Sequence, residues 1–465
     1  MIIKSKKLAY DSNGNIVPRF ITKCIEEHLK DTDRLQKLYN YYIGKQSILN
    51  RKKSSEFVAN NKGVYNHAKN IIDTSVGYVF GQPIQYNNLP EEVEQLFILE
   101  DEDSHNVTIG TDMAIYGRAV ELLYLSNDLT DKTLPYVVRL NPINSFVVYD
   151  TDLKNTPIMG ITYSENRDIE DNFINYTIIV YTTDYTYNFS TIDLKAGTLT
   201  LQDIEINQFG CIPILEVYNN EFEQGDFEPV IGLLDAYNIL MNDRLNDKEQ
   251  LADAILVIKG ICLGDNDEEV STTKNWIRDN GLLAFEDNEA SAEYITKTFN
   301  ETDIEILKKA IITDIHKITH IPDMSDENFV GNSSGIAMAY KILGFEQLGI
   351  NKERAFKQLL RKRLIVMAQS PTMTFNVADV DIKMSRTLPV DKSFKLDELQ
   401  RTEGILSLET RLKNYDPELD VTEELKRIQA EKELEARTMA NAYNTLQFPN
   451  NNKPIEEDMS NNKDE

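Results

Sequence analysis

The segment that comes closest to a catalytic motif spans residues 331–335, Gly-Asn-Ser-Ser-Gly, and matches the G-x-S-x-G pattern of a nucleophile elbow. In that motif an apolar strand precedes the serine, and a histidine later in the chain activates the serine for attack on an acyl carbon. All five histidines of this chain precede Ser333, and residues 323–328 are mostly acidic and polar. The pattern therefore favours a loop to which glycine and serine give freedom of movement. A serine hydrolase that uses Ser333 is the alternative.

Two other patterns could hold a metal ion. His316 and His320 are four residues apart, a spacing that places two imidazole rings on one face of a helix, where zinc could bind. The glutamate of H-E-x-x-H is absent, and no third ligand is evident. The acidic run 265–269 resembles part of a calcium loop but lacks its glycine and its distal glutamate. We expect solvent-facing or interface histidines, a solvated acidic turn, and no metal or cofactor.

A third chemistry, contact with phosphate, is suggested by a basic stretch at residues 352–363. Its six cations are Lys352, Arg354, Lys357, Arg361, Lys362 and Arg363, with Glu353 as the single acid among them. Clustered lysine and arginine neutralise nucleic-acid phosphates, so these side chains could contact a DNA backbone along a channel wall. The same residues could instead form a solvated face or pair with acidic neighbours. The sequence leaves both interpretations open.

These candidates fall in residues 226–370, where the pattern predicts two long helices around a small β-rich insert, then a loop and a third helix. The first helix carries an apolar stripe of Val230, Leu233, Leu234, Tyr237, Leu240, Met241, Leu245, Leu251 and Ala252. The insert is predicted to hold strands at Ile255–Ile258, Leu282–Phe285 and Glu293–Thr298, and a helix at Ser271–Asp279. The second helix is expected to begin at a Thr302 or Asp303 cap and to end before Pro322. The third runs from Ile336 to about Ala368, with candidate bends at Gly344 and Gly349.

The apolar stripes of the first two helices need neighbours to cover them. The second helix presents Ile304, Leu307, Ile311, Ile315 and Ile318 on one face. A hairpin of two such helices cannot bury both stripes completely within one chain. The layout therefore favours a ring of identical subunits, in which adjacent hairpins cover each other.

The remaining parts of the chain suggest an α+β body. Helices are predicted over residues 18–45 and Val64–Phe80, and a helix-to-strand stretch over 107–125. Short β runs follow at Tyr136–Leu140, Ser145–Tyr149, Ile158–Tyr163, Tyr176–Tyr181, Thr186–Phe189, Leu199–Gln202 and Ile212–Tyr218, and we expect them to form an antiparallel region. Further β runs are predicted at Thr372–Asn376 and Val380–Met384. Residues 395–445 are helical and charged, and residues 449–465 are expected to be disordered.

The composition and charge of the chain limit the classes of function that it could have. The chain has 465 residues and a net charge of −27, which disfavours tight binding of DNA but suits a surface that DNA must slide past. Three distant cysteines, Cys24, Cys211 and Cys262, make a disulfide framework improbable and fit a reducing compartment. The N-terminus lacks the apolar region of a signal peptide, and no apolar run approaches the ~18 residues needed to span a bilayer.

Several local sequences resemble those of the phage portal, or head–tail connector, family of the SPP1 type. The most specific match joins residues 60–73 to 77–84, which follow the pattern NN…N…K-x-I-V-D…Y-x-x-G-x-P-I. Further matches lie at residues 39–44, 51–53, 115–119, 141–150, 382–389 and 404–410. The resemblance covers about residues 35–435. Thr387, where the family often has asparagine, and Leu406 are minor departures.

The resemblance implies a portal fold assembled as a ring, usually of twelve subunits and possibly of thirteen when isolated. The implied parts are an N-terminal arm and helix (1–54), a wing of mixed α/β structure (55–225), a stem helix (226–254), a small α/β clip (255–300), a return stem helix (301–320), a tunnel loop (321–335), a long kinked helix (336–370), a wing return (371–396), a helical crown (397–448) and a disordered acidic tail (449–465).

The family resemblance also implies a function without catalysis. The ring would lie at one capsid vertex, as the channel through which double-stranded DNA is packaged and ejected without sequence preference. The implied partners are the terminase large subunit, a head-completion or adaptor protein, and the major capsid and scaffolding proteins. The location would be the virion, and the host cytoplasm during assembly. A structural scaffold that does not meet DNA is a further alternative.

The implied site residues fall into three groups. Those of the tunnel loop are Ser325, Asn328, Phe329, Val330, Asn332, Ser333 and Ser334. Those that would contact the DNA backbone are the six cations of residues 352–363. Those of the clip, where partner proteins would bind, are Lys274, Trp276 and Arg278.

Overall fold

A computed structural model describes residues 1–52, 59–127, 133–195, 198–251, 255–259, 266–280, 291–295, 301–323, 335–386, 392–415, 419 and 421–445. The chain divides into two compact units, Met1–Thr387 and Leu388–Glu465. The fold mixes helices and strands, as the sequence predicts.

Most of the predicted β runs form one six-stranded sheet in the first unit. Its strands, in spatial order, are β1 (Ile2–Ile3), β5 (Ser145–Tyr149), β6 (Pro157–Arg167), β7 (Phe173–Tyr181), β8 (Tyr185–Thr191) and β9 (Thr200–Ile206). All neighbours pair in antiparallel fashion except β1, which lies parallel to β5. The predicted antiparallel region is therefore confirmed, with one parallel edge strand that the sequence did not indicate.

A second sheet has three strands in the order β10 (Ile214–Tyr218), β3 (Arg118–Asn127) and β4 (Thr133–Leu140). Helix α4 (Glu102–Tyr116) leads into β3, which confirms the predicted helix-to-strand stretch. Gly117 makes the turn between them with φ 79°, a left-handed conformation that favours glycine. The inner faces of the two sheets meet through buried Val120, Val147 and Ile214.

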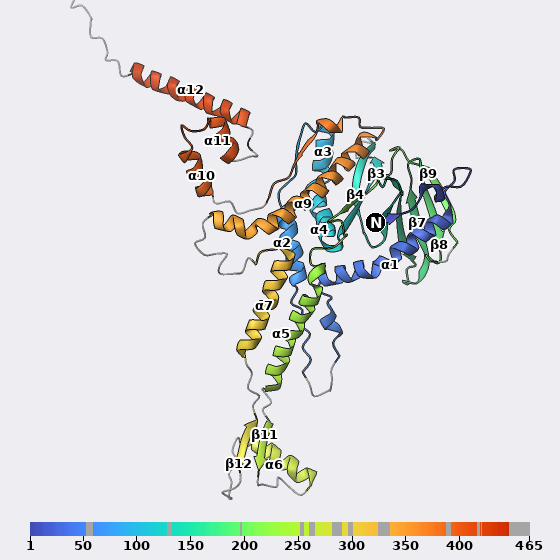
Figure 1. Ribbon diagram of the computed structural model, residues 1–465, viewed down its shortest axis with the longest axis vertical. Helices are drawn as coiled ribbons and strands as arrows, with labels where there is room; N and C mark the ends of the chain where they lie inside the picture. The colour runs from blue at the N-terminus through green and yellow to red at the C-terminus, as the bar shows by residue number, and fades with distance from the viewer. Residues whose placement is uncertain are drawn as a thin grey trace, which may run out of the picture. The chain divides into compact units, whose positions relative to one another are not determined.

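Helix α1 (Pro18–Tyr42) joins two cores (Figure 1). Its first half packs Ile21 and Ile25 in a cluster with residues of the six-stranded sheet, and its second half packs Leu35 and Leu38 in the central cluster. That cluster also holds α2 (His67–Phe80), α4 and part of α9. Helix α2 begins three residues later than predicted because the Asn66 side chain accepts a hydrogen bond from the Lys69 N–H and caps it.

Short elements complete this body. They are η1 (Lys6–Leu8), η2 (Ser47–Asn50), β2 (Gln85–Asn87), α3 (Glu91–Leu99), η4 (Val377–Asp379) and β13 (Asp381–Lys383). Strand β13 pairs with β2, which confirms the β run predicted at Val380–Met384. The β run predicted at Thr372–Asn376 is wrong. The Asn376 side chain there accepts a hydrogen bond from the Ala378 N–H and starts the turn of η4.

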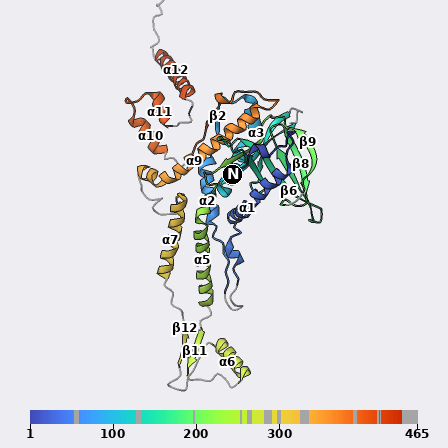
Figure 2. The same ribbon diagram turned by 45° about the vertical axis from the view of Figure 1, so that its right-hand side comes forward.

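The predicted helical hairpin is present. After η3 (Glu228–Val230), α5 (Ile231–Leu251) runs beside α7 (Glu301–Thr319), as both views show (Figures 1 and 2), and an ion pair joins Arg244 to Glu305. The insert between them contains β11 (Ile255–Lys259), α6 (Asp267–Asn280) and β12 (Ser291–Ile295), with β11 antiparallel to β12. The strand predicted at Leu282–Phe285 lies outside the described residues.

The predicted third helix is α9 (Gly335–Ala368), which changes direction along its length (Figures 1 and 2). A Cβ at Gly344 would lie 3.1 Å from His320 Nδ1, and one at Gly349 would lie 3.2 Å from a ring carbon of Tyr78. The two glycines therefore allow neighbouring side chains to approach α9 closely.

The second unit contains α10 (Lys392–Arg401), α11 (Leu408–Tyr415) and α12 (Val421–Thr445), in agreement with the predicted helical and charged region. Over the part of the chain that the structure describes, no helix has the length and apolar character needed to span a bilayer.

The turn at Gly117 gives a test of the fold. Gly14 and Gly117 both have φ near +80°, but a Cβ at Gly14 would meet open space, whereas one at Gly117 would lie 2.0 Å from the Glu223 carbonyl oxygen. We expect Gly14→Ala to cost about 1–2 kcal/mol of unfolding free energy from the left-handed backbone alone. We expect Gly117→Ala to cost a further ~1–3 kcal/mol from the clash. Urea unfolding of both variants measures the difference, and equal losses would contradict the packing at this turn.

Candidate functional site

The predicted tunnel-loop residues Ser325, Asn328, Phe329, Val330, Asn332, Ser333 and Ser334 lie outside the described residues, but both ends of the loop are described. At its start, His316 Nδ1 lies 2.9 Å from the Ile321 carbonyl oxygen, and Nε2 lies 3.9 Å from a carboxylate oxygen of Asp323. At its end, the chain enters α9 directly. The imidazole of His316 therefore fixes the chain where it leaves α7.

The metal-binding interpretation of His316 and His320 fails on geometry. Helix α7 ends at Thr319, and His320 follows it with a left-handed backbone at φ 58°, so the i, i+4 pair does not lie within one helix. Within the described ranges, no group of three or more histidine, cysteine or acidic residues could hold a metal ion.

The basic stretch of α9 divides into buried and exposed cations, and Lys352 is one of the buried ones. Its side chain is 2% exposed and forms an ion pair with Asp226, which is 3% exposed. Asp226 also accepts a hydrogen bond from Asn219 Nδ2 at 3.0 Å. The prediction that Lys352 contacts DNA is wrong, because its ammonium is buried inside the subunit against Asp226. Leaving that carboxylate buried without its partner would cost several kcal/mol of stability.

Arg363 is the second buried cation. Its guanidinium donates to both carboxylate oxygens of Glu121, at 3.0 and 2.7 Å, and also to Glu102 at 2.7 Å and Asn106 at 2.9 Å. Burial alone would raise the pKa of Glu121, but the Arg363 guanidinium and a hydrogen bond from His105 lower it to about 2. The prediction that Arg363 contacts DNA is therefore also wrong, since it joins α9 to α4 and β3.

Lys357 is half-buried and pairs with Glu353 at 2.7 Å, one helical turn away. Glu353 also receives a hydrogen bond from Arg386 at 2.6 Å, which ties α9 to the segment after β13. The pKa of Glu353, which burial alone would raise, is lowered by these two cations. The ion-pair interpretation of the basic stretch therefore holds for Lys357, as it does for Lys352 and Arg363.

The exposed cations are Arg354, Arg361 and Lys362. Arg354 and Arg361 are seven residues apart on α9, which places them on nearly the same face of the helix. These three side chains are the part of the basic stretch that a phosphate could reach.

The predicted clip residues Lys274, Trp276 and Arg278 all belong to α6. Their side chains are not among those described, so their role stays a prediction. Of the acidic run at 265–269, the structure describes residues 266–269. Asn266 accepts a hydrogen bond from the Glu269 N–H at 3.0 Å, and the acids form the first turn of α6. These acids are exposed, as expected for a solvated acidic turn, and in a first turn they also complement the helix dipole.

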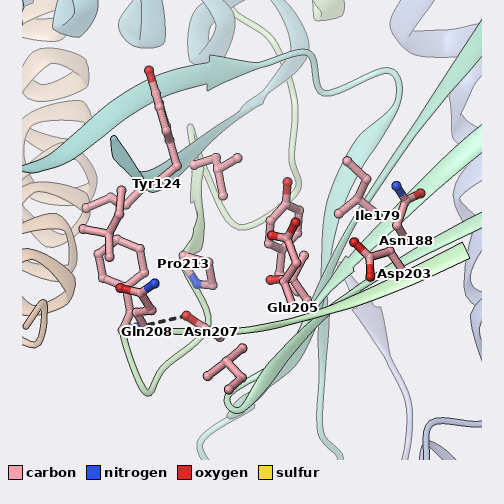
Figure 3. Close-up of a pocket in the computed structure, with 15 residues that line it drawn as sticks. Tyr124, Ile179, Asn188, Asp203, Glu205, Asn207, Gln208 and Pro213 are labelled. Atoms are coloured by element: carbon pink, nitrogen blue, oxygen red, sulfur yellow. Dashed lines mark hydrogen bonds between the residues drawn. The ribbon is translucent and has the colours of Figure 1, made fainter. Parts of the chain in front are cut away.

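A groove of about 330 Å³ lies between the two sheets (Figure 3). It is lined on one side by residues of β3, such as Tyr124, and on the other by Ile179, Asn188, Asp203 and Glu205 of the large sheet. Its fifteen lining residues include two carboxylates and no lysine, arginine or histidine. This charge would repel phosphate, so the groove is not a DNA site.

The residues that sequence reasoning missed are three asparagines on α5. Asn238, Asn242 and Asn246 are buried, although the predicted stripe counted only apolar positions. Their spacing of four residues, which keeps them on one helical face, was the available signal. They bond to the chain segment at residues 59–66.

Comparison with known proteins agrees with this organisation. Residues 21–438 match the family described as "Phage portal protein, SPP1 Gp6-like". The chain belongs to this family of phage portal proteins. The portal protein of Clostridium phage phiCD119 is 21% identical over 438 residues, which cover 88% of this chain and 94% of that protein.

The two kinds of cation on α9 can be told apart by stability. Arg363→Met leaves Glu121 buried without its partner, and we expect a loss of ~3–5 kcal/mol in unfolding free energy. Arg361→Met, two residues away on the exposed surface, is the control and should change stability by no more than ~0.5 kcal/mol. Urea unfolding at pH 7 measures both, and an Arg363→Met variant as stable as the control would contradict the buried pair.

The same pair predicts a pH dependence. The pKa of Glu121 is about 2 in the folded chain, below the ~4.3 of an unperturbed glutamate. Its contribution to stability is thus present above about pH 4.3 and is lost as the pH falls toward 2. Arg363→Met should flatten this part of the stability profile, and Arg361→Met should not.

Proposed function

We propose that this phage portal protein assembles as a closed ring at one capsid vertex and forms the channel through which double-stranded DNA enters and leaves. The observation that supports the ring most directly is the exposed apolar surface of the hairpin. On α7, Leu307 and Ile318 are 49% and 50% exposed, and on α5, Ile239 and Leu245 are 48% and 43% exposed. These side chains remain exposed although α5 and α7 already lie side by side within the subunit.

The apolar stripe of α7 is covered along one edge only. Ile311 and Ile315 pack into the central cluster, whereas Leu307 and Ile318, at the other edge of the same stripe, stay half exposed. We call this second edge the outer side of α7. A head-to-tail contact that closes would set this outer side of α7 against the hairpin of the next subunit. Burial of apolar area there would contribute about 25 cal/mol per Å². We propose twelve subunits in the virion, as in the family, with thirteen as a possible number for the isolated ring.

We assign a function to each part of the subunit as in the portal family. In our proposal the hairpin is the stem, residues 255–300 are the clip, residues 321–335 are the tunnel loop, and the helices of residues 397–448 are the crown. The clip would bind the terminase large subunit and later an adaptor protein through Lys274, Trp276 and Arg278. The body would contact the major capsid and scaffolding proteins. The protein would be present in the host cytoplasm during assembly.

DNA contact in this proposal is weak and independent of sequence. The charge of −27 per subunit prevents the polyanion from sticking to the ring. The contacts would come from the tunnel loop and from Arg354, Arg361 and Lys362, the exposed cations of α9. The portal family is structural, so a serine hydrolase at Ser333 is not favoured.

Ring formation is tested at the outer side of α7. The double substitution Leu307→Glu and Ile318→Glu places charges on a surface that must be desolvated between subunits, and we expect monomers with unchanged helix content. Thr313→Glu, which adds a charge at an exposed polar position of the same helix, is the control. Sedimentation velocity and circular dichroism provide the readouts. Rings formed by the double variant as readily as by the control would exclude this surface from the interface.

The tunnel loop is tested by deletion. Removal of residues 329–334 should leave ring formation intact, because the loop lies between helices that are anchored elsewhere. Packaging of DNA should be blocked, because the loop would no longer contact it. Electron microscopy of the purified variant and a packaging assay measure the two effects. Loss of the ring itself would show that the loop is part of the subunit interface.

A further inference from the structure

Residues 59–66, which lead into α2, run beside α5 in both views (Figures 1 and 2). We call these residues the strap. It forms no helix and no strand, yet its backbone is bonded regularly to the stem helix. Those bonds do not come from backbone groups of α5, which are used within the helix. They come from asparagine side chains.

Three rungs join the strap to α5. The Tyr65 N–H donates to Asn238 Oδ1 at 2.9 Å. The Gly63 N–H donates to Asn242 Oδ1 at 2.6 Å, and Asn242 Nδ2 donates back to the Gly63 carbonyl at 2.7 Å.

The third rung is at the far end. The Asn61 N–H donates to Asn246 Oδ1 at 2.7 Å, and Asn61 Nδ2 donates to the same oxygen at 3.0 Å. We call Asn238, Asn242 and Asn246 the asparagine ladder.

The ladder can bond to the strap because the spacing of residues along α5 matches their spacing along the extended strap. Four residues of helix advance about 6 Å, and two residues of extended chain advance about 6.6 Å. Each second strap residue, at positions 61, 63 and 65, therefore meets the next asparagine one turn along α5, in antiparallel order. Since the groups recognised are backbone N–H and C=O, the ladder holds the strap largely independently of its side chains.

The ladder is buried and continues into the body. Asn238 and Asn242 have no exposed surface. Asn238 Nδ2 donates to Gln46 Oε1 at 2.5 Å, and Gln46 Nε2 donates to Asn66 Oδ1 at 3.0 Å and to the Tyr41 carbonyl at 3.2 Å. Asn66 in turn caps α2. One chain of hydrogen bonds thus links α5 to the end of α1 and to the start of α2.

The anchored length of α5 is considerable. Asp235 near its start accepts hydrogen bonds from the Tyr41 hydroxyl at 2.8 Å and from Ser47 Oγ at 2.6 Å. From Asp235 to Asn246 the helix advances about 16 Å. Helix α7 covers another side of α5, so the strap and α7 together hold it from two directions.

At its other end, α2 contacts α9. The Tyr78 ring stacks on Phe345 with centroids 4.2 Å apart, and the Tyr78 hydroxyl donates to Glu346. Because α9 leads out of the tunnel loop, α2 connects the strap to the helix that would carry the loop.

We propose that the asparagine ladder is a mechanical coupling, in which Asn238, Asn242 and Asn246 are positioning residues that make α5, the strap and α2 move as one body with the adjoining part of α9. The coupling rests on the proposed function, because the passage of DNA supplies the load. Movement of the stem would then reach the loop through packed and hydrogen-bonded elements within one subunit.

The test uses two asparagines with different requirements. Asn246 contributes only its carbonyl oxygen to the strap, so Asn246→Asp should keep the rung and Asn246→Ala should lose it. Asn242 both accepts and donates, so neither Asn242→Asp nor Asn242→Ala should preserve its rung. Asn351→Ala, at an exposed position of α9, is the control.

Hydrogen exchange of the full-length protein, followed by mass spectrometry, is the measurement. Loss of a rung should speed exchange of the strap amides by about fivefold to tenfold, the equivalent of one net hydrogen bond. Coupling predicts that exchange at residues 343–350 of α9 also rises. The Asp variant at position 246 and the Asn351→Ala control should behave as the wild type.

Two outcomes would overturn the coupling. If strap exchange is unchanged in Asn242→Ala, the ladder does not hold the strap. If strap exchange rises while residues 343–350 are unaffected, the ladder is a local brace and transmits nothing. Failure of the wild-type protein to form rings would instead contradict the proposed function, and sedimentation of the same samples separates that result from the other two.

Discussion

The position of α9 depends on charges that are buried in pairs. Lys352 is paired with Asp226, which precedes the stem, and Arg363 is paired with Glu121 and Glu102 in the body. Each cation would leave an uncompensated buried carboxylate if it moved away, at a cost of several kcal/mol. The two anchors are eleven residues, or about 16 Å, apart along the helix. They fix α9 at a defined position, and its exposed cations are placed relative to that position.

The sequence predicted local structure well where the pattern is local. Most of the β runs, the helix-to-strand stretch over 107–125 and the long third helix follow from alternation and helical spacing, and the structure contains them. The strand predicted at residues 372–376 is wrong. The Asn376 side chain accepts a hydrogen bond from the Ala378 N–H and sets a turn there instead. His320 lies just beyond α7, which ends at Thr319, in agreement with the expectation that this helix stops before Pro322.

The candidate site was harder to predict because its decisive contacts are distant in sequence. Lys352 and its partner Asp226 are 126 residues apart, and Arg363 and Glu121 are 242 residues apart. A cluster of cations looks the same in sequence whether its partners are phosphates or buried carboxylates. The asparagine ladder was missed for a related reason, since an analysis of apolar periodicity treats Asn238 and Asn242 as interruptions of a stripe. In the folded chain they are its most buried polar members.

The hairpin of this chain leaves apolar surface uncovered. It is anchored firmly to the body by the strap and by buried charges, yet it exposes large apolar side chains on its outer side. Electron microscopy of the purified wild-type protein at micromolar concentration tests this account most directly. We predict class averages of a closed ring with a central opening and with the hairpins packed against one another. A compact single-chain particle, with no larger species at any ionic strength or protein concentration that supports assembly, would contradict it.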